Sequence, residues 1–156
     1  MRSFLSFCFI LTTSIAFSQV NFKELTLQEA FKEASKKGKI VFVQFVSATC
    51  KQCNEVADRA FIDKKLGATA DEKCIAIKID LQSTDRVNFI EKYNSDENLG
   101  SFFFTGDADL LHRTTTTTSL ATTYINDIEL AYNRFSEGRM PLKELDNLWT
   151  THNGDF

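Results

Sequence analysis

Apolar and polar positions follow two different periods along this chain, which predicts helices and strands in alternation. Residues 27–37 repeat apolar side chains at helical spacing, and Thr26 with Glu29 forms a capping box at their start. Gly38, preceded by two lysines, ends this predicted helix. Residues 40–46 are an almost continuous apolar run, Ile-Val-Phe-Val-Gln-Phe-Val. Such a run is typical of a central parallel strand that is covered on both faces.

The alternation continues through the rest of the chain and predicts an α/β fold. Helices are expected from about Cys50 to Phe61, from Ser83 or Thr84 to Tyr93 and from Ala121 to Phe135, and strands over residues 75–80, 102–104 and 110–115. Three polar stretches, 64–65, 71–73 and 107–109, are expected to be solvated loops. The predicted order is α-β-α-β-α-β-β-α, which requires a central mixed sheet with helices on both faces.

The two ends of the chain have patterns of their own. Met1-Arg2-Ser3 is a short positive start, residues 4–15 are apolar, and Ala16-Phe17-Ser18 places small residues around a bulky one. This is the pattern of a signal peptide cleaved after Ser18, so we expect residues 1–18 to be removed on export, leaving no membrane span. The alternative is a buried N-terminal strand or helix.

A short amphipathic helix is expected to start at Pro141 in the tail 137–156. This tail either packs back on the main domain, residues 19–136, or begins a further helical region. On this pattern we expect the chain to be the front part of a longer protein.

Composition narrows the class of protein. The 156 residues are 43% hydrophobic and 25% charged with a net charge of −3, which suits one globular domain. No concentrated Lys/Arg surface is apparent, so nucleic acid is not an expected partner. Fifteen Phe supply enough apolar volume that the fold needs no disulfide framework. The cysteines are therefore expected to carry chemistry.

That chemistry is expected at Cys50-Lys51-Gln52-Cys53. A disulfide between these two cysteines would stabilise the fold only weakly. Closing so small a loop contributes about 2 kcal/mol of stability, whereas closing a fifteen-residue loop contributes roughly 3 kcal/mol. As a zinc site it is half complete, because Cys74, His112 and His152 do not stand at ligand spacing, so we expect no metal and no other cofactor. An accidental pair is disfavoured by position, directly after an apolar strand and at the start of an amphipathic helix.

The start of a helix favours an anion. Its first turn carries unpaired N–H groups and the positive end of the helix dipole, so the Cys50 thiolate should be stabilised and its pKa lowered. Lys51 adds a nearby positive charge, and Cys53, on the apolar face, should be shielded. One exposed nucleophilic sulfur and one buried resolving sulfur is the arrangement that thiol–disulfide exchange requires.

In residues 40–53, 75–80, 102–107 and 111–113 the chain resembles the thioredoxin family, and more closely the exported thioredoxin-like proteins of bacteria. The resemblance implies a thioredoxin-like fold and a periplasmic or extracellular location. It also implies exchange with protein thiols or disulfides, with Cys50 attacking and Cys53 resolving, and a redox partner protein.

Some positions depart from the family's pattern. The family usually has a cis-proline before the Phe-rich strand, where this chain has Leu99-Gly100, and a non-proline bond there should be trans. A buried acid is replaced by Gln44, a tryptophan by Thr49, and a Gly-Pro pair by Lys51-Gln52. We therefore take Lys51, Gln52, Leu99 and Gly100 as supporting residues around the cysteines. Two alternatives stay open: a binding module whose cysteine pair is inert, and metal binding through the same pair.

Two other positions are expected to be structural. Cys74 starts a strand of alternating isoleucines and should be a buried core thiol. His112-Arg113 should be a solvated strand end.

Overall fold

A computed structural model describes residues 19–93, 100–115 and 117–138. The predicted signal peptide, Leu99, and the predicted tail beyond residue 138 therefore lie outside the described residues. The described elements, in chain order, are β1 (Phe22–Lys23), α1 (Leu27–Lys37), β2 (Ile40–Val46), α2 (Lys51–Phe61), α3 (Lys64–Lys73), β3 (Cys74–Asp80), α4 (Thr84–Tyr93), β4 (Ser101–Phe104), β5 (Leu110–Thr114) and α5 (Ala121–Ser136).

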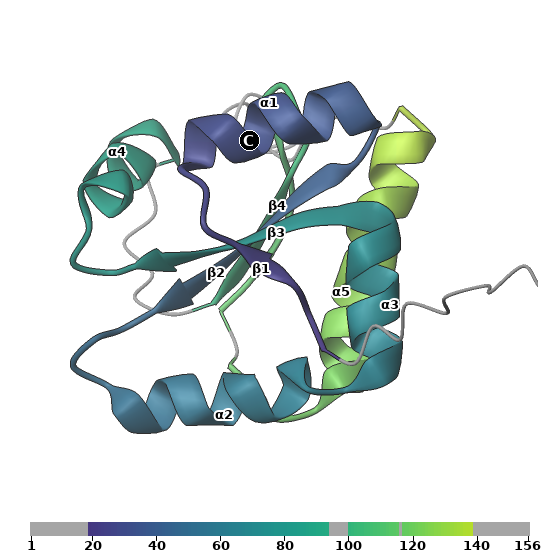
Figure 1. The fold of residues 1–156 in the computed structure, drawn as a ribbon. Coiled ribbons are helices and arrows are strands. Elements are labelled where there is room, and N and C mark those ends of the chain that lie inside the picture. Colours follow the sequence, from purple (N-terminus) through teal and green to yellow (C-terminus); the bar gives the residue numbers. More distant parts are fainter. Residues whose placement is uncertain (1–18, 94–99, 116, 139–156) are drawn as a thin grey trace, which may run out of the picture.

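The strands form one mixed sheet in the order β1-β3-β2-β4-β5. β1, β3 and β2 are parallel, whereas β4 is antiparallel to β2 and β5 is antiparallel to β4. Val43 of β2 lies between Ile77 of β3 and Phe102 of β4, so β2 is a central strand as expected. Figure 1 shows helices on both sides of the sheet, with α1 and α4 on one side and α2, α3 and α5 on the other. The predicted α/β class and mixed sheet are confirmed.

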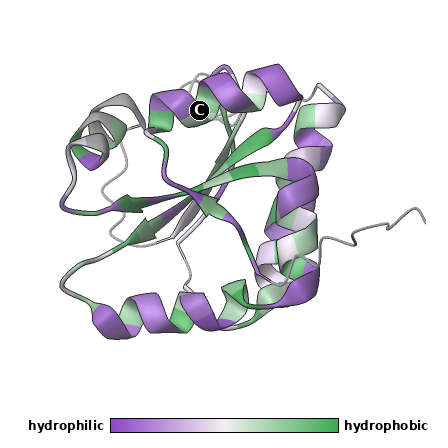
Figure 2. Ribbon diagram, viewed as in Figure 1, coloured by the Kyte–Doolittle hydropathy of each residue, from purple (hydrophilic) through white to green (hydrophobic). Residues whose placement is uncertain are grey.

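Side chains of β2 alternate between two cores. Ile40 and Phe42 point to the face covered by α2, α3 and α5, and Val41, Val43 and Phe45 point to the face covered by α1 and α4. All five are almost completely buried. The continuous apolar run in the sequence is therefore explained by a strand that has helices on both of its faces. In Figure 2 the sheet is mainly hydrophobic, while the helices carry hydrophilic residues on their outer sides.

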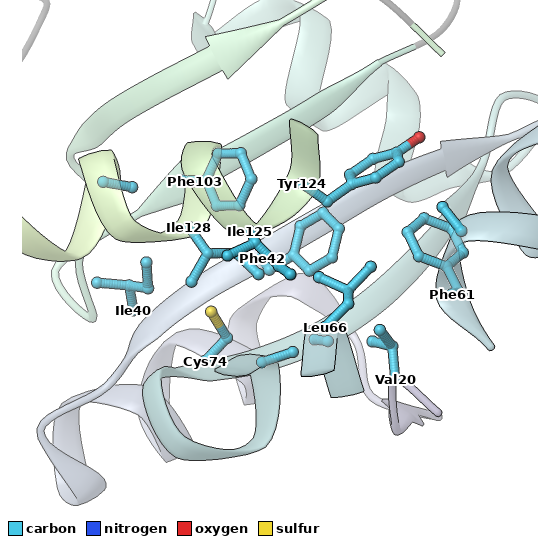
Figure 3. Close-up of a cluster of buried hydrophobic side chains, with 14 of the residues drawn as sticks. Val20, Ile40, Phe42, Phe61, Leu66, Cys74, Phe103, Tyr124, Ile125 and Ile128 are labelled. Carbon is cyan, nitrogen blue, oxygen red and sulfur yellow. The ribbon is translucent and has the colours of Figure 1, made fainter. Parts of the chain in front are cut away.

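Aromatic rings fill the core under α2 and α5. The Phe42 ring stacks on Phe103 with centroids 5.0 Å apart, and the rings of Phe61 and Tyr124 lie 4.9 Å apart beside them. Figure 3 shows these side chains converging between the sheet and the helices, with Leu66 among them. Ala57, Ala60 and Phe61 join this core, so the second half of α2 is packed against the sheet.

Two elements differ from the sequence prediction. β1 was not expected, because two residues are too few to show a period. Residues 64–65 and 71–73 were expected to be loops, but they are the two ends of helix α3. Asp63 caps this helix by accepting a hydrogen bond from the Leu66 N–H at 2.9 Å. The loop prediction was wrong because the helix buries only Leu66, Gly67 and Ala70, so its charged ends dominate the local pattern.

The remaining described elements match their predictions within one or two residues, including the 107–109 turn between β4 and β5. In the described part of the chain, no helix combines the length and the apolar character needed to cross a membrane.

Candidate functional site

Cys50 and Cys53 are joined by a disulfide bond at the start of α2, with their Cα atoms 5.3 Å apart. Figure 1 shows the chain leaving the end of β2 and turning into α2. Cys50 is the N-cap residue of this helix, and Cys53 lies in its first turn. Both cysteines are half-buried, so the expected contrast between an exposed Cys50 and a buried Cys53 is not found. The disulfide thus joins two half-buried residues shortly after the end of the central strand.

Backbone amides at this helix end are available to an anion. The N–H groups of Cys53 and Asn54 donate to the Cys50 carbonyl oxygen at 3.1 and 3.3 Å. Lys51 and Gln52 are the first two helical residues, so their amides have no acceptor within the helix. These two N–H groups, together with the helix dipole, favour negative charge on a sulfur at the N-cap position.

The side chains of Lys51 and Gln52 contribute less than the sequence suggested. Lys51 has 91% of its side chain exposed, and its Nζ lies 3.9 Å from the Glu55 carboxylate, four residues along the helix. Solvent screening makes such an exposed charge weak. Gln52 is also exposed. The electrostatics of the site therefore depend mainly on the backbone of α2.

Three polar residues that the sequence analysis did not select hold the loop before Cys50. Ser47 is a buried residue whose N–H donates to Asn54 Oδ1 at 3.0 Å and whose carbonyl oxygen accepts from Asn54 Nδ2 at 2.8 Å. The Ser47 hydroxyl oxygen accepts from the Cys50 N–H at 3.2 Å and pairs with the Thr49 hydroxyl at 3.0 Å. In the sequence, the only sign of this hydrogen-bonded loop was a polar residue at each end of the short connection between the strand and the helix, Ser47 and Thr49.

Gln44 and Ser101 form an uncharged pair on neighbouring strands. The Ser101 hydroxyl donates to Gln44 Oε1 at 2.7 Å, and Gln44 Nε2 donates to the Phe45 carbonyl oxygen at 3.0 Å. Both residues are buried. Because side chains alternate along a strand, Gln44 points to the same face of β2 as Phe42. The pair can accept and donate hydrogen bonds but cannot take up a proton at neutral pH.

Gly100 lies at the start of β4 beside the end of β5. Its φ of +141° is a conformation that side chains rarely adopt, and its carbonyl oxygen accepts from the Phe45 N–H at 3.1 Å. A Cβ atom at this position would lie 2.2 Å from the Thr114 carbonyl oxygen. Among the described residues no peptide bond is cis. Only glycine fits this position, so the residue before β4 is determined by backbone packing.

Two other candidate residues lie on strands of the sheet, Cys74 on β3 and His112 on β5. Cys74 is a free thiol buried with the aromatic core, and this burial raises its pKa well above the ordinary range. The prediction of a core thiol is confirmed. His112 and Arg113 were expected to form a solvated strand end. Arg113 is exposed, but His112 is mostly buried: its Nε2 lies 3.0 Å from Asp127 Oδ1, and its ring stacks on Phe103. Within the described residues, no cluster of three or more His, Cys, Asp or Glu suited to a metal is present.

Several solved structures share this architecture. A putative disulphide-isomerase from Bacteroides thetaiotaomicron is 20% identical with a TM-score of 0.60, over 73% of this chain and 93% of that one. A DsbH oxidoreductase is 14% identical with a TM-score of 0.63, over 83% and 95% of the two chains. A thioredoxin from Thermus thermophilus is 14% identical with a TM-score of 0.58, over 76% and 90%. At these identities the similarity establishes a thioredoxin-like fold.

Sequence comparison gives the family. No curated protein matches the chain significantly. A DsbH-type thioredoxin family model, described as "Protein of unknown function, DUF255", matches residues 13–100, which is more than half of the chain. This match includes the central strand, the cysteine pair at the start of α2 and the parallel strand β3. The chain therefore belongs to this thioredoxin-like DUF255 family.

Proposed function

We propose that this protein is an exported thiol–disulfide oxidoreductase that exchanges disulfides with protein substrates through Cys50 and Cys53. The observation that carries the proposal is a disulfide between two half-buried cysteines at the start of α2, shortly after the central strand. When the pair is reduced, the free amides and the helix dipole would stabilise a thiolate at Cys50. Family membership and the similarity to a DsbH oxidoreductase and a putative disulphide-isomerase support the same chemistry.

The reaction needs two successive sulfur displacements. The Cys50 thiolate attacks one sulfur of a substrate disulfide, so that a Cys50–substrate S–S bond forms and the other substrate sulfur leaves as a thiolate. The Cys53 proton then passes through solvent to the substrate thiolate released in the first step, and the Cys53 thiolate attacks the Cys50 sulfur. The Cys50–Cys53 disulfide forms, and the substrate leaves with both sulfurs reduced, having gained two electrons. The reverse sequence oxidises a substrate dithiol, and a redox partner protein restores the starting state of the pair.

Substitution of each cysteine tests the assignment. Cys50→Ser should abolish the reduction of insulin disulfides, because no nucleophile remains at the helix end. Cys53→Ser should trap mixed disulfides, which separate as larger species on a non-reducing gel. Cys74→Ala is the matched control, since Cys74 is buried in the core and takes no part in either displacement. Insulin reduction by Cys50→Ser at the rate of the unsubstituted protein would refute the proposed function.

Export and domain organisation belong to the same proposal. Residues 1–18 act as a signal peptide, residues 19–136 form the redox domain and residues 137–156 form a C-terminal helical region. The substrates would then be proteins of the periplasmic or extracellular space, where disulfides persist. N-terminal sequencing of the protein isolated from its native cells should give Gln19 as the first residue, and a chain that retains Met1 would contradict export by this route.

A second candidate function is a binding module with an inert disulfide. The uncharged Gln44–Ser101 pair favours it, because no buried acid is available there to take the Cys53 proton. A reduction potential far below about −300 mV would indicate this function, since such bonds resist exchange with cellular thiols.

A further inference from the structure

The Asn54 side chain links the first turn of α2 to the loop before Cys50. Its side-chain amide makes two hydrogen bonds to one residue, Ser47: Oδ1 accepts from the N–H at 3.0 Å, and Nδ2 donates to the carbonyl oxygen at 2.8 Å. Only a side chain with one donor and one acceptor at this length satisfies both groups. The Asn54 amide therefore satisfies both backbone hydrogen-bonding groups of Ser47, as a neighbouring β-strand does in a sheet. These two bonds connect the residue after β2 to the first turn of α2.

The same connection reaches the Cys50 backbone. The Cys50 N–H donates to the Ser47 hydroxyl oxygen at 3.2 Å and lies 3.3 Å from the Ser47 carbonyl oxygen. The Asn54 N–H donates to the Cys50 carbonyl oxygen at 3.3 Å. The Cys50 carbonyl oxygen is thus held by backbone N–H groups of α2, those of Cys53 and Asn54. The Cys50 N–H is held by Ser47, and only this second connection depends on the Asn54 side chain. We call Ser47 and Asn54 the loop clamp.

Fixing these peptide groups has a direct consequence for the sulfur. Cys50 makes no side-chain capping hydrogen bond in the oxidised protein, where its sulfur is bonded to Cys53. After reduction, the sulfur gains most from the free amides of α2 if the Cys50 backbone stays at the N-cap position. A loop that is free to move would separate the thiolate from these donors for part of the time. The clamp keeps the two together.

We propose that Asn54 is a positioning residue, which acts through Ser47 to hold the Cys50 thiolate at the amino end of α2. The inference rests on the proposed function, because it concerns the reduced, reactive state of the cysteine pair. It assigns a role to a residue in the turn after the second cysteine, where the sequence carries no other sign of function.

Asn54→Ala tests the proposal through the ionisation of Cys50. Loss of the clamp should raise the Cys50 pKa by about half to one unit, which is the usual strength of helix-end interactions. The acid dissociation constant of the Cys50 thiol would then fall by a factor of roughly three to ten. Because the thiolate form of the reduced protein is then less stable, the equilibrium with glutathione should shift toward the protein disulfide by a similar factor. The Cys50 pKa is measured by pH-dependent alkylation, and the equilibrium by separating the two redox forms.

Asn133→Ala is the matched control, since Asn133 is an exposed asparagine on α5 and lies outside the site. Ser47→Ala is the second variant: it removes the hydroxyl that accepts from the Cys50 N–H but leaves the backbone groups that Asn54 binds. If both residues act through one loop, the pKa change of the double variant should be smaller than the sum of the single changes. If Asn54→Ala does not fold, the Cys50 pKa of Ser47→Ala still tests the clamp: a raised pKa supports it, and an unchanged pKa contradicts it.

The outcomes separate this inference from the proposed function. A low Cys50 pKa in the unsubstituted protein that rises in Asn54→Ala, but not in Asn133→Ala, supports the clamp. A low pKa that is the same in Asn54→Ala, or that rises equally in both variants, overturns the clamp and leaves the proposed function intact. A Cys50 pKa near 8.5 in the unsubstituted protein overturns both, because the thiol is then not activated.

Discussion

Replacement of Gly100 by alanine tests whether the backbone before β4 leaves room for any side chain. An added Cβ would lie 2.2 Å from the Thr114 carbonyl oxygen, whereas real Cβ contacts essentially never fall below 3.0 Å. The end of β5 would therefore have to retreat by roughly 0.8 Å, which disturbs the Ser101–Thr114 pairing and the hydrogen bond from Phe45 to the Gly100 carbonyl oxygen. A φ of +141° adds conformational strain for alanine.

The expected loss of unfolding free energy follows from these two effects. Backbone strain of this kind amounts to about 1–3 kcal/mol, and each weakened hydrogen bond adds about 1 kcal/mol. Gly100→Ala should thus destabilise the protein by about 3–5 kcal/mol. Two other glycines separate the contributions. Gly38 has a φ of +62° and open space around it, so Gly38→Ala should lose only about 1 kcal/mol. Gly106 would meet Ser35 backbone atoms at 2.6 Å without a positive φ, so Gly106→Ala should lose about 1–3 kcal/mol.

Urea unfolding followed by far-ultraviolet circular dichroism, with all proteins in the same redox state, measures these differences. We expect Gly38→Ala to lose the least unfolding free energy, Gly106→Ala to lose more and Gly100→Ala to lose the most. A Gly100→Ala protein as stable as Gly38→Ala would refute the reasoning, because the close approach of Thr114 would then have no energetic consequence.

Further predictions concern the core, the free thiol and acid stability. Phe42→Ala should lower the unfolding free energy by about 3–5 kcal/mol in the same urea assay, because the fully buried ring leaves a cavity, and Phe42→Leu should lower it less. Cys74 should resist alkylation in the folded protein, since burial raises its thiol pKa, and mass spectrometry of its peptide should show modification only in denaturant. Hydrogen bonds from Lys23 and Lys37 lower the Glu33 pKa to about 2, so its stabilising effect is complete above about pH 4.5 and is lost as the pH falls toward 2. Glu33→Gln should therefore flatten the acid limb of stability against pH, and an unchanged limb would contradict the ion pairs.

Local patterns were sufficient for the parts of the fold whose burial is regular. The run at 40–46 predicted a central strand because a strand covered on both faces needs an apolar residue at every position. The helix that begins after Cys50 was equally predictable, since its apolar residues recur on one face. Together these two elements placed the cysteine pair at a strand-to-helix junction, and that placement needed no knowledge of distant contacts.

What the sequence determined by itself was the junction: a buried strand, a helix after it and two cysteines at the start of that helix. Only the tertiary structure decided how the junction is held. The bonds between Asn54 and Ser47 and the contact of Gly100 with Thr114 each depend on positions brought together by the fold, and hydrophobic periodicity carries no information on such contacts. Helix α3 was missed for a related reason, because three small or apolar buried positions become a recognisable face only when the sheet beneath them is known.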